Sequence, residues 1–427
     1  MAGAQLAQRR ARAVDQIARR GGSVLMGALP ARDHPLARST RIERANRFFE
    51  RAWEKGWLPP PVLQPETLWQ SAASPLGAEA RDAEIAGRRP EDVADFRERL
   101  TRIAAAIHQD ADLNALGRVM AYGQLERVIR NRLLLGQKWT RDPSLLATRI
   151  APPIIVIGHM RSGTTRIQKL LAADPAHSHT RYCDAFHPVP GSLIWRRAKA
   201  AGEIAFLKAL NPWLQSIHPI ASGEVEEELG WLAGALQHSI YEAQWRIPSY
   251  SAWSEQRNAS SIYRELARVL RTDAAHRRLA DRPRVMKVPV FSENLPELLA
   301  EFPDAKLIVA ERDHDAVHRS AVSLVANQMA VQSDSCDLAA IETEWHRKIA
   351  LREERREAAL RNWAGPITRL SFDELTADWE SAITRAYADL GMNLTEPALA
   401  AMRALMAQSG KGAHQAHSAQ LSHFKPA

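Results

Sequence analysis

The sequence PPIIVIGHMRSGTT, residues 152–165, decides the fold class of this chain. Four consecutive β-branched residues at 154–157 predict a short strand that is buried on both faces. Gly158 and Gly163 bound a tight loop, and a helical pattern follows over about residues 164–173. A loop of this kind directs backbone N–H groups inward at a helix N-terminus. The segment therefore predicts an anion-binding site.

The glycines have the spacing G-x-x-x-x-G of a nucleotide-triphosphate loop, but Thr164-Thr165 replace the expected Lys-Ser/Thr. Arg161 supplies the positive charge instead, with a fork of donors that suits oxyanions. No apolar run ending in Asp stands out as a magnesium-binding partner motif. We therefore expect anion binding without ATP or GTP hydrolysis. The candidate contacts are Arg161, Ser162, Gly163, Thr164 and Thr165.

The rest of residues 151–427 supports an α/β fold. Three further β-type runs lie at 285–288, 307–310 and 367–371, and longer helical stretches separate them. Short apolar runs alternating with helices are typical of a parallel sheet with crossover helices. We expect a P-loop-type parallel sheet flanked by helices.

Residues 1–150 contain no chemical motif and predict a helical layer packed on that core. An apolar stripe with 3- and 4-residue spacing runs from Ile42 to Trp53, before three consecutive prolines at 59–61. A second stripe runs from Phe96 to Gln137 and is interrupted at Gln124.

Composition narrows the class of protein. The chain has 427 residues, 45% of them hydrophobic, which excludes global disorder. Its two cysteines cannot form a disulfide framework, and no run of about 18 apolar residues predicts a membrane span. We expect a cytoplasmic protein. The sequence leaves a homo-oligomer open.

The net charge of +8 raises the question of a polyanionic partner. Basic residues are scattered and often stand beside acids, as in the REERRE run at 352–357, which argues against nucleic acid. Residues 1–51 hold eleven arginines against four acids and only two serines. That segment fits a basic helix and loop better than a transit peptide.

The RSGTT sequence after a PPI strand resembles the 5′-phosphosulfate loop of sulfotransferases, which use 3′-phosphoadenosine 5′-phosphosulfate (PAPS). It is most similar to the broad bacterial family with PR[ST]GTT loops, and similar also to tyrosylprotein sulfotransferases. The resemblance implies transfer of a sulfuryl group from PAPS, without a metal, to a hydroxyl or amine. A small molecule, a glycan or a lipid would be the acceptor. The alternative is a P-loop kinase of nucleotides or small molecules.

A second anion site is expected after the strand at 307–311, where Arg312 follows and Ser320 lies eight residues further on. Open α/β sheets bind ligands at the carboxyl ends of their strands, and arginine with a hydroxyl suits a phosphate. The resemblance implies that this pair holds the 3′-phosphate of PAPS. His314 stands where relatives usually have proline. Lys411 and Gly412 resemble the loop that closes over the same phosphate.

Catalysis needs positive charge and a base for the acceptor proton. Lys287, near the end of the second β-type run, is the candidate cation, but the histidine that relatives carry nearby is replaced by Pro289 and Phe291. Asp184 resembles the acidic residue of relatives, and we expect its apolar neighbours to raise its pKa. His218 is the second candidate base because imidazole titrates near neutral pH.

Two other features have bland interpretations. The acidic cluster of Glu224 and residues 226–228 is most simply a solvated helix start. Five tryptophans between residues 190 and 255 are better assigned to core packing than to a ligand pocket. No spacing of histidines and carboxylates predicts a metal site.

Overall fold

The structure is a computed structural model that describes residues 32–408. The expectations for the first 31 residues and for Lys411 and Gly412 lie outside this range. Contacts within the chain separate residues 1–32 from a compact unit of residues 33–427. All that follows concerns that second unit.

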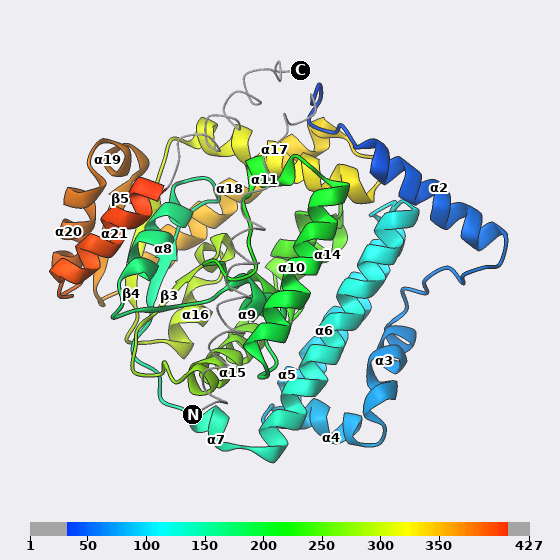
Figure 1. Cartoon of the computed structure of the whole chain (residues 1–427), viewed down its shortest axis with the longest axis horizontal. Coiled ribbons are helices and arrows are strands. Elements are labelled where there is room, and N and C mark those ends of the chain that lie inside the picture. The colour runs from blue at the N-terminus through cyan, green and yellow to red at the C-terminus, as the bar shows by residue number, and fades with distance from the viewer. Residues whose placement is uncertain (1–31, 409–427) are drawn as a thin grey trace, which may run out of the picture. The chain divides into compact units, whose positions relative to one another are not determined.

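A five-stranded sheet has the strand order β2-β3-β1-β4-β5, and its strands β3, β4 and β5 lie toward the left in Figure 1. All neighbouring strands are parallel, so the predicted α/β class with helices on a parallel sheet is confirmed. Four strands match the predicted runs to within one residue, but the two-residue β2 carries no pattern that would predict it. The strands are β1 (Ile154–Ile157), β2 (Ser178–His179), β3 (Arg284–Lys287), β4 (Lys306–Glu311) and β5 (Ile367–Ser371).

The central position of β1 determines where the site lies. β1 pairs with β3 on one side and with β4 on the other, with Val156 opposite both Lys287 and Ile308. The loop after β1 therefore lies between the end of β3 and the end of β4. Lys287 and Arg312, which come from those two ends, are brought to the same loop.

Side chains of the strands alternate between two apolar layers. Ile155 and Ile157 face one layer, which also contains Leu266 of helix α15 (Ser260–Arg277). Ile154 and Val156 face the other, which contains Leu170 of helix α8 (Thr164–Ala173). The alternation follows from the two-residue period of a strand and explains why all four residues of β1 are fully buried.

The predicted helices before residue 150 are present, with one correction. The stretch from Phe96 to Gln137 is two helices, and the break lies at residues 110–114 rather than at Gln124, which is inside the second helix. Asn114 caps that helix through its side chain. These helices are α2 (Thr40–Glu54), α3 (Pro65–Ala73), α4 (Glu79–Ile85), α5 (Pro90–Gln109), α6 (Ala115–Arg141) and α7 (Ser144–Ala147).

Helix α6 is held by two close backbone contacts. A Cβ atom on Gly136 would lie 1.8 Å from the carbonyl oxygen of Ala83, and one on Gly117 would lie 2.0 Å from that of Gln332. Only glycine permits these approaches, which fix α6 against α4 and against the end of α17.

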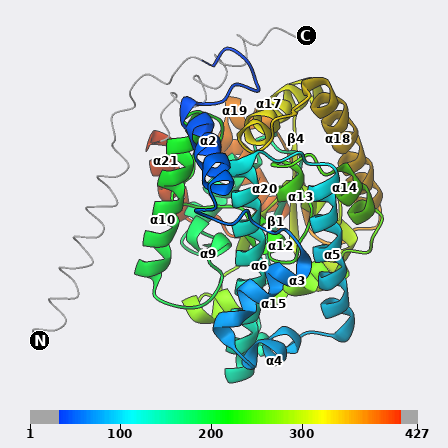
Figure 2. The ribbon, with the colours of Figure 1, turned by 90° about the vertical axis from the view of Figure 1, so that its right-hand side faces the viewer.

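The remaining helices pack around the sheet, and several of them contribute residues to the cavity described below. Helix α10 packs beside α2 (Figure 2). No helix in the described part of the chain is long and apolar enough to cross a membrane. Their bounds are α8 (Thr164–Ala173), α9 (Tyr182–Phe186), α10 (Leu193–Leu210), α11 (Leu214–Ile217), α12 (Leu229–Ala233), α13 (Ser239–Glu242), α14 (Pro248–Glu255), α15 (Ser260–Arg277), α16 (Leu295–Glu301), α17 (His314–Gln332), α18 (Leu338–Leu360), α19 (Phe372–Ala377), α20 (Trp379–Asp389) and α21 (Glu396–Gln408).

Candidate active site

The loop between β1 and α8 has the geometry of an anion cradle. Gly158, Arg161 and Gly163 all have positive φ angles of 146°, 70° and 90°. Gly163 is the N-cap of α8, and no side chain caps the helix there. The first-turn N–H groups and the positive end of the helix dipole are therefore available to a negatively charged group.

Ser162 supports the loop from within. Its side chain is fully buried, and its hydroxyl donates a hydrogen bond of 2.6 Å to the carbonyl oxygen of His159. The serine hydroxyl is thus used inside the loop, and the residue does not line the cavity described below. The expectation that Ser162 contacts the ligand stays a prediction.

Arg161 contacts both Ser320 and Arg312, and the expectation that Arg312 and Ser320 share a phosphate stays a prediction. Arg161 donates to Ser320 Oγ at 2.8 Å and to the carbonyl oxygen of Ile217 at 3.1 Å. Arg312 donates to the carbonyl oxygen of Arg161 at 2.7 Å, and its guanidinium lies 3.9 Å from the centre of the Phe372 ring. Burial, together with the charge of Arg312, lowers the pKa of Arg161. Two cations crowded together favour an anion as their ligand, although the carboxylates of Asp313 and Asp373 also lie near Arg312.

Lys287 reaches the start of α8 from the neighbouring strand. Its Nζ donates to Thr165 Oγ1 at 3.1 Å and forms an ion pair with Glu227. Its backbone N–H donates to Glu228 at 2.9 Å. The Lys287 side chain is only 2% exposed, so these partners set the position of its ammonium group.

Apart from the exposed Glu224, the acidic cluster is not solvated, contrary to the sequence interpretation. Glu228 is fully buried, and Glu226 and Glu227 line the same cavity as Lys287. Burial raises the pKa of Glu228 to about 7. The error arose because their partner, Lys287, lies some 60 residues further along the chain.

His218 lines the cavity and faces Glu226, with 3.8 Å between its Nε2 and the carboxylate. Burial raises the pKa of Glu226, but the interaction with the nearby His218 outweighs it, so the pKa is lowered overall. The histidine side chain is 36% exposed. It is therefore accessible to a ligand and oriented by a carboxylate, as a general base requires.

Asp184 lies in a different environment from the one predicted. Its fully buried carboxylate contacts three arginines: Arg181 at 2.6 Å, Arg277 at 3.3 Å, and Arg196. Burial raises the pKa of Asp184, but the arginines outweigh it and lower the pKa. The expected rise is thus wrong, and Asp184 is not among the residues that line the cavity.

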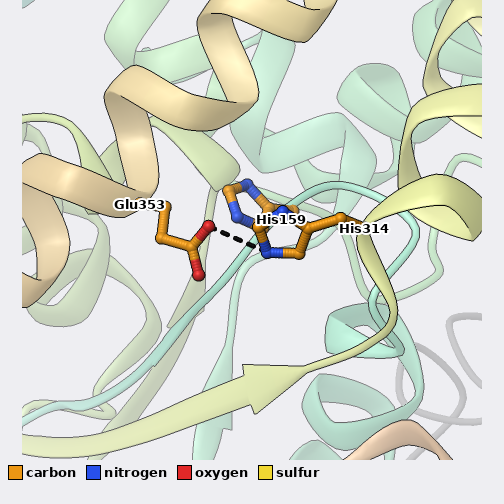
Figure 3. Close-up of side chains that lie close together, drawn as sticks. All are labelled: His159, His314 and Glu353. Atoms are coloured by element: carbon orange, nitrogen blue, oxygen red, sulfur yellow. Dashed lines mark ion pairs between the residues drawn. The ribbon is translucent and has the colours of Figure 1, made fainter.

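Two groups of histidines and carboxylates lie close enough to share an ion. Figure 3 shows the first, in which His314 pairs with Glu353 at 2.8 Å beside His159 of the loop. Burial and nearby positive charges, chiefly Arg356, lower the pKa of His159 to about 3. The neutral imidazole is the form that binds a metal, but the positive charges of Arg352 and Arg356 nearby disfavour a cation at this position.

In the second group, His238 with Glu255 and Glu293, both carboxylates are paired with basic side chains. Lys348 pairs with Glu255, and Arg352 donates to Glu293 at 3.1 Å. Both groups are therefore explained by ion pairs, and the expectation of no metal site stays a prediction.

A cavity of about 1210 Å³ lies beside the loop between β1 and α8. It is lined at one end by Arg161, Thr165, Lys287 and Arg312, with His218 beside them. Two basic residues that the sequence analysis missed, Arg166 and Lys169 of α8, also line it. Lys169 is spaced i+4 from Thr165 and i+3 from Arg166 on the predicted helix, and this spacing could have identified the basic face.

The tryptophans are placed mostly as expected. Trp213, Trp231 and Trp245 are buried in the core, but Trp195 is 77% exposed. None of them lines this cavity in the part of the chain that the structure describes.

Comparison with known proteins agrees with this geometry. A family model described as "Sulfotransferase family" matches residues 152–396. The sulfotransferase STF1 from Mycobacterium tuberculosis H37Rv superposes with a TM-score of 0.70 at 25% identity, over 84% of this chain and 98% of that one. STF9 from Mycobacterium avium shares the fold, with a TM-score of 0.69 at 20% identity over 82% and 89% of the two chains. No curated protein matches the chain.

Proposed function

Because the chain belongs to the sulfotransferase family, we propose that it transfers a sulfuryl group from PAPS to a hydroxyl or amine of an acceptor. One observation carries the proposal. The basic side chains of three separate strand ends, Arg161, Lys287 and Arg312, meet around the uncapped N-terminus of α8 in one cavity. This concentration of positive charge suits a donor with two phosphate groups and a sulfate.

The residues present fit PAPS. The N–H groups at the start of α8 and the side chains of Thr164 and Thr165 would hold the phosphosulfate. The loop needs glycine at 163, because a Cβ there would approach Phe372 to 3.2 Å at a φ of 90°. Arg312, Ser320 and Arg161 would hold the 3′-phosphate, and Arg166 and Lys169 would add charge at the same end.

Two side chains would act on the reacting groups. His218 would take the proton of the acceptor hydroxyl while the oxygen–sulfur bond forms and the sulfur–oxygen bond to the 5′-phosphate breaks. Lys287, beside Thr165, would stabilise the charge that develops on the departing phosphate. Access to the cavity supports His218 over Asp184, whose carboxylate is enclosed by arginines.

The donor is tested by thermal unfolding with adenosine 3′,5′-bisphosphate, the expected by-product. At about 100 times its dissociation constant, a ligand stabilises the folded state by about 2.7 kcal/mol. We expect this shift for the bisphosphate and a much smaller one for ATP with Mg²⁺. The double variant Arg161→Ala, Arg312→Ala should lose the shift. Equal stabilisation by ATP–Mg²⁺ would contradict the proposal and favour a kinase.

A further inference from the structure

The cavity is larger than one ligand requires. Ligand sites usually have volumes of about 300–1,000 Å³. At about 1210 Å³, this cavity exceeds that range, and most of its basic residues lie at the end beside β1, β3 and β4. The other end is formed by helices α6, α10, α11 and α17, and the donor does not need it.

That second end is mainly apolar. Apolar side chains from these helices line it, among them Met120, Phe206, Leu210, Leu214 and Val331. Phe206 is 54% exposed and lies on α10 where the cavity meets solvent. An apolar wall that continues to an exposed aromatic residue favours a ligand with an extended apolar body.

Several polar side chains at this end are engaged with one another, although Ser239 Oγ of α13 lines the cavity without a hydrogen-bond partner among the described residues. Gln124 and Gln332 both donate to Gln244 Oε1, at 3.0 and 3.1 Å. Arg127 pairs with Glu203 at 3.3 Å. A sugar needs a partner for each buried hydroxyl, and amides that satisfy each other provide few.

Gly123 of α6 marks the space that the acceptor would fill. It lines the cavity, and a Cβ atom placed on it would meet nothing within 4 Å. Gly117 and Gly136 of α6 differ from it, because a Cβ atom on either would lie less than 3 Å from a neighbouring backbone. No such contact accounts for Gly123, although glycine inside a helix is unfavourable.

We propose that the acceptor is an amphiphile, a long-chain or fused-ring alcohol or phenol, whose apolar body lies along α6 and α10. Its hydroxyl reaches His218 and Lys287, and Gly123 sets how bulky the body can be. This inference rests on the proposed sulfotransfer and names the acceptor class. The oxygen of the alcohol bonds to sulfur, its proton passes to His218, and adenosine 3′,5′-bisphosphate leaves.

The test uses Gly123→Phe, with Gly202→Phe as the matched control. Gly202 is an exposed glycine of helix α10 that does not line the cavity, and a Cβ atom placed on it would also meet nothing within 4 Å. Binding of 2-naphthol and dodecanol is measured calorimetrically with saturating adenosine 3′,5′-bisphosphate, and transfer is measured with PAPS. Glucose and a tyrosine peptide serve as comparison acceptors.

We expect wild-type protein to bind and sulfate 2-naphthol or dodecanol in preference to glucose and the peptide. Gly123→Phe should weaken binding of the apolar alcohols at least tenfold and leave bisphosphate binding within twofold, whereas Gly202→Phe should change neither. Preference for glucose or the peptide, no saturable binding of either alcohol, or an unaffected Gly123→Phe would overturn the acceptor class. Bisphosphate binding remains in all three cases if the proposed function is right, and its absence identifies failure of that function instead.

Discussion

Asp184 and His218 show how burial separates two candidate bases. Three arginines from different parts of the chain enclose the Asp184 carboxylate, and the indole N–H of Trp231 donates to its backbone carbonyl at 2.8 Å. A carboxylate so paired is held ionised, and it is a weak proton acceptor. His218 has one carboxylate neighbour and an open side toward the cavity.

Replacing Asp184 should therefore lower mainly the stability of the protein, and replacing His218 should lower mainly kcat. Asp184→Asn leaves buried arginine charge without its partner and should cost about 3–5 kcal/mol in the free energy of unfolding. His218→Ala should leave stability nearly unchanged and lower kcat by about 10²- to 10⁴-fold. Urea unfolding and kcat per folded molecule are measured for both. A stable Asp184→Asn protein with greatly reduced kcat would instead assign the base to Asp184.

Glu228 makes stability depend on pH. Its folded-state pKa of about 7 lies above the ordinary value of 4.5, so the folded protein binds this proton more tightly than the unfolded chain. The stabilisation is complete below pH 4.5 and is lost as the pH rises through 7. Between pH 5 and 8, wild-type protein should lose up to about 3 kcal/mol relative to Glu228→Gln.

Urea unfolding of both proteins across that pH range measures the difference. Glu224→Gln is the matched control, since Glu224 is exposed on the same segment. We expect it to keep the pH dependence of the wild type. Parallel curves for wild-type protein and Glu228→Gln would show that Glu228 ionises normally.

Helix α6 forms a wall of the cavity, and its position depends on glycine contacts with its neighbours. Gly136→Ala places a Cβ 1.8 Å from the carbonyl oxygen of Ala83, so α4 and α6 must move apart. We expect a loss of about 1–3 kcal/mol in the free energy of unfolding. Gly123→Ala, in open space on the same helix, should gain about 0.5–1 kcal/mol. Chemical denaturation of the two variants measures both changes, and equal stabilities would show that α6 relaxes freely.

The secondary structure that carries the loop was readable from sequence because its signals are local. The run at 154–157 is apolar throughout, and glycines mark both ends of the loop that follows. Helix α8 has the predicted bounds, 164–173. Strand β2, at residues 178–179, was missed because two residues carry no periodicity.

Across the whole molecule, the parts of the site that were missed depend on contacts distant in sequence. Glu227 appeared solvated because its partner, Lys287, comes from strand β3, 60 residues further along the chain. Asp184 appeared to have apolar neighbours because two of its arginines, Arg196 and Arg277, lie 12 and 93 residues away. The anion loop was predictable from one segment, whereas the charges around it required the folded chain.

The two ends of the cavity are built from different elements. Loops at the strand ends and helix α8 form the basic end, while α6 and α10 form much of the apolar end. At Gly123, a side chain can be added in open space without disturbing the loop that binds the anion. Random mutation can therefore vary the second compartment in single steps while the first is conserved. Such a protein is well arranged for the divergence of a family, and for directed evolution toward new products.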